Sequence, residues 1–250
     1  MSWTGKLIGG GLGYVIGGPI GAVIGGVLGN KFDQNNKSKV DSKFNKKEKS
    51  NMIFFTTTFS MLAKFAQADG TVTKSEIKVI DNFVRNELQL KEQSRKLAIE
   101  IFDKAKFNNN SFEDFANQFY NHFRHQQSLL ISMLDLLMRI AVADSDFHSR
   151  EEECIIKVKH IFEINDSQYE SIKARYIKED NLDKYYKILG VSPDASMSKI
   201  KKEYRKKVKE FHPDNITGKG LPEEFRNFAE EKFKEIQEAY EMVSEKKKAS

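Results

Sequence analysis

The spacing of the apolar residues is the feature that most limits the folds open to this chain. In the stretch SMSKIKKEYRKKVKEF, apolar residues recur at i, i+4, i+8 and i+11: Ile200, Tyr204, Val208 and Phe211. This spacing places them in one stripe along a helix. Similar patterns run through most of the chain, and only four prolines interrupt its 250 residues. We therefore predict an all-α protein.

The first thirty residues carry glycine at helical spacing. This segment holds 11 of the 15 glycines and a single charged residue, Lys6. Seven glycines lie four residues apart, in six consecutive GxxxG steps: Gly5, Gly9, Gly13, Gly17, Gly21, Gly25 and Gly29. Between Lys6 and Lys31 lie 24 uncharged residues, about 36 Å of helix at about 1.5 Å per residue, which is enough to cross a bilayer. We therefore predict a glycine-zipper transmembrane helix at residues 1–30.

The glycine spacing also predicts close packing with other helices in the membrane. Small residues four apart let helix backbones approach one another, so we expect self-association into a homo-oligomer. The stripe turns roughly 240° around a straight helix over the six steps, so the glycines form a packing surface with several sides. The alternative is a hairpin broken at Pro19. Its halves of about 11 residues would be too short to span a bilayer and would lie on it.

Composition divides the rest of the chain into three parts. Residues 31–51 hold seven lysines against three acidic residues, which is typical of a flexible linker. Residues 52–178 show a series of amphipathic helical patterns, and a short polar break separates them from a basic unit at residues 182–250. The formal net charge of +5 allows an acidic partner or an anionic membrane surface but does not require nucleic acid. The single cysteine, Cys154, excludes an intramolecular disulfide.

Residues 52–178 contain an internal repeat. It aligns LAKFAQADGTVTKSE at residues 62–76 with LMRIAVADSDFHSRE at residues 137–151, an offset of 75 residues. In each copy an apolar helical pattern ends in Ala-Asp, and a glutamate follows seven residues after that aspartate. We therefore expect a helical bundle built from two similar helix–turn–helix halves.

The carboxylates of the repeat support two interpretations. Asp69 and Glu76 in the first copy correspond to Asp144 and Glu151 in the second. Hard cations prefer clustered carboxylates, so these four are candidate ligands of a divalent cation. In the other interpretation the glutamates close capping boxes and the aspartates end the preceding turns, which is the commoner use of such residues.

The segment resembles the TerB-like domain of tellurite-resistance proteins. The resemblance rests on Asp69, Gly70 and Glu76 in the first copy and on Asp144 and Glu151 in the second, and it covers about half of the chain. It implies a helical domain with an acidic repeat of this kind. Ser145 stands where the first copy has Gly70, so the second turn departs from the pattern.

The basic C-terminal unit centres on Phe211-His212-Pro213-Asp214. Pro213 ends the preceding helical pattern and fixes a turn that carries an imidazole and a carboxylate. The segments DKYYKILGVSPDAS, IKKEYRKKVKEFHPD and FKEIQEAYEMVSE follow one another in the order typical of a J domain, and the unit resembles that family. The resemblance implies a helical hairpin that docks on an ATP-bound DnaK-type chaperone and stimulates its ATP hydrolysis.

The resemblance also implies which residues dock. His212, Pro213 and Asp214 carry over directly. The candidates for a positive docking face are Lys202, Arg205, Lys206 and Lys209, whose charges would mainly set orientation and association rate.

Two other interpretations of this unit are weaker. His212 and Asp214 could form an acid–base pair, but no nucleophile or cofactor motif accompanies them, so we expect no enzymatic activity. The lysine-rich helix could bind nucleic acid, but no aromatic stacking platform lies beside it, so we expect no nucleic-acid partner.

The order of the three parts resembles the DjlA-like family of membrane-anchored co-chaperones. The resemblance implies a protein of the bacterial inner membrane that recruits a DnaK-type chaperone. Lysines follow the glycine-rich segment, which predicts a single pass with the N-terminus outside and the domains in the cytoplasm. We expect no cofactor beyond the candidate divalent cation. The alternative is a TerB-type metal-binding or stress-response scaffold that uses the J domain for recruitment.

Overall fold

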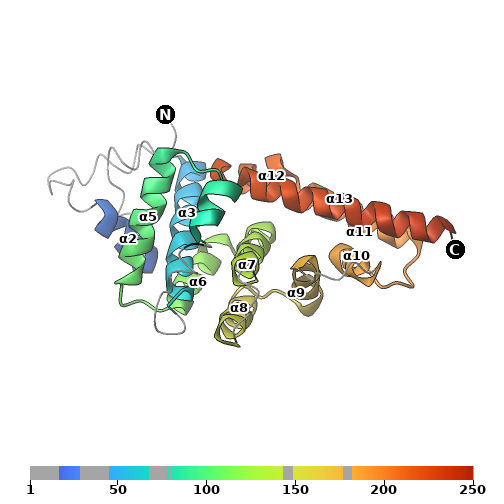
Figure 1. The fold of residues 1–250 in the computed structure, drawn as a ribbon, viewed down its shortest axis with the longest axis horizontal. Helices are drawn as coiled ribbons and strands as arrows, with labels where there is room; N and C mark the ends of the chain where they lie inside the picture. Colours follow the sequence, from blue (N-terminus) through green and yellow to red (C-terminus); the bar gives the residue numbers. More distant parts are fainter. Residues whose placement is uncertain are drawn as a thin grey trace.

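The computed structural model describes residues 17–28, 45–67, 78, 80–142, 149–176 and 182–249. These residues form helices and the turns between them, with no β-strand among them, so the all-α prediction is confirmed. Figure 1 shows α2, α3, α5 and α6 at one end, and the long helix α13 runs toward the other. The elements are α2 (Gly18–Leu28), α3 (Lys46–Phe65), η4 (Phe83–Glu87), α5 (Glu92–Lys106), α6 (Phe112–Phe123), α7 (Gln127–Ala141), α8 (Ser149–Ile161), α9 (Asp166–Lys173), η5 (Ala174–Tyr176), α10 (Leu182–Leu189), α11 (Met197–Phe211), α12 (Pro213–Lys219), η6 (Glu223–Phe225) and α13 (Arg226–Ala249).

Helix α3 is the central helix of the N-terminal bundle, by which we mean α2 to η5. From Ser50 to Phe65 every residue except Lys64 is buried, although the sequence pattern predicts an amphipathic helix. Its threonines are buried as well, and the hydroxyl of Thr58 donates to the carbonyl oxygen of Phe54 at 2.8 Å. The bond of Thr58 to its own helix satisfies that hydroxyl, whereas the buried hydroxyls of Thr56, Thr57 and Ser60 have no hydrogen-bond partner within the described residues.

Helix α3 begins inside the segment that composition assigned to a linker. Asn45 and Glu48 form a capping box: the backbone N–H of Glu48 donates to Asn45 Oδ1 at 2.9 Å, and the backbone N–H of Asn45 donates to Glu48 Oε2 at 3.0 Å. This reciprocal pair satisfies two backbone donors at the helix start. The residues from Lys46 to Asn51 are therefore helical rather than part of the linker.

The second half of the glycine-rich segment is helix α2, which packs on α3, α5 and α6. Ile20, Val23 and Ile24 are buried in this contact. Gln118 of α6 accepts a hydrogen bond from the backbone N–H of Ile20 at 2.8 Å. At Gly18 the backbone has φ +73°, and an added Cβ would lie 3.0 Å from the Gln118 side chain, so glycine is required there.

Three glycines of the predicted zipper fall within the described residues. Gly17 is exposed just before α2, Gly21 is buried within it, and Gly25 is half-buried. The other four lie outside the described residues: Gly5, Gly9, Gly13 and Gly29. Within the described part of the chain, no helix combines the length and the apolar character that crossing a membrane requires.

The C-terminal unit consists of α10 to α13. Helices α11 and α13 run antiparallel: Tyr204 stacks on Tyr240 with centroids 4.0 Å apart, and His212 meets Phe233 edge-on at 5.4 Å. The predicted apolar stripe of α11 faces α13, although only its two end residues, Ile200 and Phe211, are fully buried. Helix α10 packs on α13 and closes the unit.

The C-terminal unit is packed against the N-terminal bundle. Phe225, which is fully buried, lies with its ring centroid 5.2 Å from that of Phe54 and 6.1 Å from that of Phe55 in α3. At Gly220 the backbone has φ +122°, and an added Cβ would lie 2.8 Å from the Cβ of Ser50. The turn after α12 therefore fits closely onto the start of α3.

Candidate functional site

The turn predicted from the sequence lies between α11 and α12. His212 ends α11 with ψ 129°, as expected for the residue before a proline, and Pro213 begins α12. The side chains of His212 and Asp214 are 46% and 69% exposed, whereas Pro213 is buried. The structure thus presents an imidazole and a carboxylate to solvent on either side of a packed proline.

Local bonds fix the orientation of both exposed side chains. The backbone N–H of Asp214 donates to His212 Nδ1 at 3.3 Å, so the imidazole serves as the cap of α12. This bond uses the nitrogen lone pair, which leaves Nε2 as the protonated position of the neutral ring. The edge contact with Phe233 holds the ring from the other side.

Arg226 holds the carboxylate of Asp214 and was missed by the sequence analysis. Its guanidinium donates to Asp214 Oδ1 at 2.9 Å and also pairs with Glu223 at 3.2 Å and Glu230 at 3.0 Å. The hydrogen bond to Asp214, followed by that to Glu230, raises the pKa of Arg226 above its ordinary value. Twelve residues separate Arg226 from Asp214, and no local pattern links them.

The four candidate cations of α11 form an exposed basic face beside this turn. All four side chains are solvent-exposed, and none forms an ion pair within the described residues: Lys202, Arg205, Lys206 and Lys209. Lys207 differs from them, because it is half-buried and donates to the hydroxyl of Ser171 in α9 at 3.0 Å. The positive face and the turn are therefore adjacent and open to a partner.

The candidate metal ligands of the repeat are for the most part not described. Asp69, Glu76 and Asp144 lie outside the described residues, and Glu151 stands in the first turn of α8. Among the residues that the structure describes, no group of three histidine, cysteine, aspartate or glutamate side chains is placed to hold a metal ion. The metal interpretation therefore remains a prediction from the sequence.

A buried ionic cluster joins the two halves of the molecule, and it too was missed by the sequence analysis. Asp135 of α7 is fully buried and pairs with Lys232 of α13 at 2.9 Å. Arg175 pairs with Asp135 and with Glu235 of α13, and the hydroxyl of Tyr176 donates to Asp135 Oδ1 at 2.8 Å.

The charges of the cluster compensate one another. Burial alone would raise the pKa of Asp135, but the charges of Arg175 and Lys232 outweigh it and leave that pKa below its ordinary value. Burial lowers the pKa of Lys232, and the positive charge of Arg175 lowers it further, while Asp135 opposes both effects. The cluster anchors α13, the helix that also carries Arg226, on α7.

Comparison with known proteins assigns each part of the chain. Residues 1–48 match the model of the co-chaperone DjlA transmembrane domain, residues 55–174 that of tellurite resistance protein TerB, and residues 184–250 that of the DnaJ domain. A co-chaperone protein DjlA of Coxiella burnetii is 30% identical over 97% of each chain. One of Haemophilus influenzae is 28% identical over 99% of each chain. No solved structure matches. The chain therefore belongs to the DjlA family of membrane-anchored, J-domain co-chaperones.

Proposed function

We propose that this protein recruits a DnaK-type chaperone and stimulates its ATPase through the turn at His212, Pro213 and Asp214 and the basic face of α11. The observation that carries the proposal is the exposure of this turn beside four solvent-exposed cations. The bundle contacts the C-terminal unit through α10, α12, η6 and α13, and Lys207 of α11 bonds to α9, while the side chains of His212 and Asp214 remain exposed. A partner can thus reach the turn without first separating the two halves.

The two parts of this surface act differently. The cations of α11 attract an acidic partner and orient it, which mainly raises the association rate and makes it fall with salt. The turn supplies groups of fixed geometry: an exposed imidazole whose Nδ1 accepts from the backbone N–H of Asp214, and a carboxylate held by Arg226. Because both are oriented before the partner arrives, little side-chain entropy is lost when contacts form.

We propose that this recruitment takes place at the cytoplasmic side of a bacterial inner membrane, with a single pass and the N-terminus outside. The lysines that follow the glycine-rich segment support this topology. The spacing of the glycines supports self-association of the anchor.

The test is the ATPase rate of a DnaK-type chaperone with the full chain in detergent micelles. We expect His212→Gln to abolish the stimulation, because the exposed imidazole contacts the partner. The matched control is His160→Gln, an exposed histidine of α8, which should stimulate as the wild type does. Stimulation by His212→Gln at the wild-type level would rule the proposal out.

A further inference from the structure

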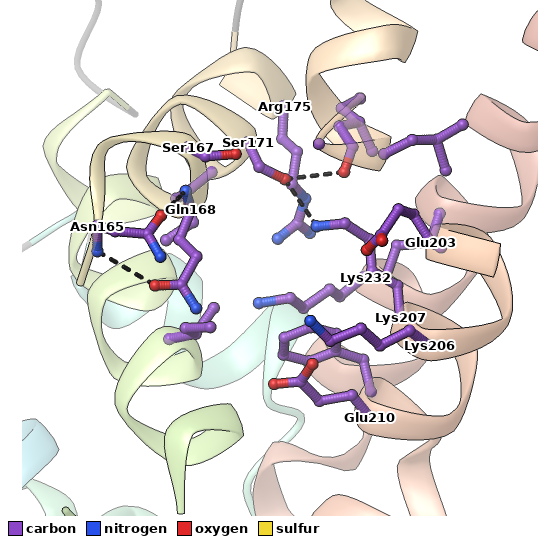
Figure 2. A pocket seen from close by; sticks show the side chains of 17 residues that line it. Asn165, Ser167, Gln168, Ser171, Arg175, Glu203, Lys206, Lys207, Glu210 and Lys232 are labelled. Atoms are coloured by element: carbon purple, nitrogen blue, oxygen red, sulfur yellow. Dashed lines mark hydrogen bonds between the residues drawn. The ribbon is translucent and has the colours of Figure 1, made fainter. Parts of the chain in front are cut away.

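A cavity of about 190 Å³ lies where the N-terminal bundle meets the C-terminal unit. Its walls come from α7, α9 and η5 on one side and from α10, α11 and α13 on the other. Figure 2 shows polar side chains of α9, among them Gln168 and Ser171, facing the lysines of the C-terminal unit across this space.

The lining is rich in cations. Arg175, Lys206, Lys207 and Lys232 all border the cavity, and Figure 2 shows the ammonium groups of the three lysines directed into it. Arg175 and Lys232 are already paired in the buried cluster with Asp135. Lys206 and Lys207 form no ion pair with a carboxylate among the described residues.

The ammonium group of Lys207 has hydrogen-bond donors that the protein does not use. An ammonium group has three hydrogen-bond donors, and within the described residues Lys207 uses one, to the hydroxyl of Ser171 at 3.0 Å. That hydroxyl itself donates to the carbonyl oxygen of Ile188 at 2.8 Å, so its orientation is fixed. The ammonium group of Lys207 therefore faces the cavity with donors to spare.

The carboxylates of the lining compensate the charge of Lys207 only in part. Glu203 and Glu210 also border the cavity, but neither forms an ion pair with a lysine in the part of the chain that the structure describes. Burial, followed by the charge of Lys232, lowers the pKa of Lys207 to about 8. Arg175 adds to this effect, and the charges of Glu210 and Glu203 oppose it without cancelling it. The ammonium group of Lys207 thus lies at the cavity without an ion-pair partner among the described residues, and a bound anion would supply one.

We propose that this cavity binds a small oxyanion of the phosphate class, held by Lys206 and Lys207 of the C-terminal unit and by polar side chains of α9. The size fits this class, because sites for larger organic ligands usually measure roughly 300–1,000 Å³. Lysine donates to phosphate oxygens as a compact charge, and the side-chain amide of Gln168 offers a neutral donor opposite it.

An anion in this position contacts both halves of the molecule. It binds the packed arrangement and not the separated one, so it stabilises the junction by mass action. It also engages Lys206, one of the four cations of the proposed docking face, so phosphate would slow the association of a DnaK-type chaperone. This last consequence rests on the proposed function, whereas binding of the anion does not.

The test is isothermal titration of the full chain in detergent micelles with inorganic phosphate at constant ionic strength. We expect one saturable site per chain. Lys207→Met should weaken binding by roughly tenfold or more, since it removes a charge-assisted hydrogen bond. The matched control is Lys201→Met, an exposed lysine of the same helix outside the cavity, which should bind as the wild type does.

A second variant keeps the test valid if Lys207→Met fails to fold. Lys206→Met alters an exposed side chain, so folding should tolerate it, and it should also weaken phosphate binding severalfold. Three results would overturn the proposal: no saturable binding by the wild type, wild-type affinity in both cavity variants, or an equal loss in Lys201→Met. Because the readout is binding of phosphate, its failure leaves the ATPase test of the proposed function unaffected.

Discussion

Asp135→Asn is the substitution that most directly tests how the two halves are joined. The side chain keeps its size and can still accept a hydrogen bond from Tyr176, but it loses the charge that compensates Arg175 and Lys232. All three side chains are buried: that of Asp135 is 0% exposed, and those of Arg175 and Lys232 are 5% exposed. Two buried cations are then left with one half-exposed carboxylate, Glu235.

The expected cost follows from that burial. Removing one partner of a buried ion pair typically destabilises a protein by about 3–5 kcal/mol, because the remaining charge stays buried without compensation. The matched control is Glu231→Gln, which removes an exposed inter-helix pair with Arg139 at 2.6 Å. An exposed pair of this kind contributes about 0–1 kcal/mol. The loss of unfolding free energy should therefore be several times larger in Asp135→Asn than in Glu231→Gln, although both residues join α7 to α13.

The measurement is urea unfolding of the full chain in detergent micelles, with hydrogen exchange of the α13 amides as a local probe. We expect the free energy of unfolding to fall in Asp135→Asn and the α13 amides to exchange faster, because α13 loses its anchor on α7. An unfolding free energy within about 1 kcal/mol of the wild-type value would refute the reasoning.

The pKa of Asp135 sets the pH dependence of this contribution. The carboxyl titrates at a lower pH in the folded protein than its ordinary value of 3.8, because the cations overcome the effect of burial. Its contribution is therefore complete above the ordinary pKa and is lost as the pH falls through the lower, folded value. Asp135→Asn should lack this component of acid unfolding.

Three further predictions concern packing and titration. Phe225→Ala should lower the unfolding free energy by about 3–5 kcal/mol, since the ring is fully buried against Phe54, whereas Phe107→Ala at an 80% exposed position should have little effect in the same urea titration. Gly220→Ala should lower the melting temperature because of the φ of +122° and the 2.8 Å approach to Ser50, whereas Gly218→Ala, which meets nothing within 4 Å, should not. Partial burial, followed by the charge of Lys46, lowers the pKa of His122. Stability should therefore fall as the pH drops below 6.5 toward the folded pKa, and His122→Gln should remove this loss in melting curves at several pH values.

The features that the sequence predicted are those encoded by neighbouring residues. The helical periods of α11 and α13 and the break at Pro213 each lie within a few turns of chain, so the all-α hairpin and its turn could be read directly. The start of α3 was also locally encoded, by Asn45 and Glu48, but the surrounding lysines favoured a linker. At this position the capping box determines where the helix starts, and the lysine-rich composition does not.

The features that sequence reasoning missed depend on residues far apart in the chain. Asp135 meets Arg175 across 40 residues, and Arg139 meets Glu231 across 92. Nothing in either neighbourhood distinguishes Asp135 from a solvated helix residue, because its partners are brought to it only by the packing of η5 and α13 against α7. The same holds for Arg226, whose position beside Asp214 depends on the turn after α12.

Helix α13 connects the junction to the turn within one rigid element. It carries Arg226, which holds Asp214, and six residues later Lys232, which enters the buried cluster. Six residues of helix span about 9 Å, so a shift of α13 at the junction moves Arg226 with it. The carboxylate of Asp214 would follow through its bond to Arg226, and the ring of His212 through its edge contact with Phe233 of α13. A change in the N-terminal bundle that displaces α13 therefore alters the surface that a partner chaperone would meet.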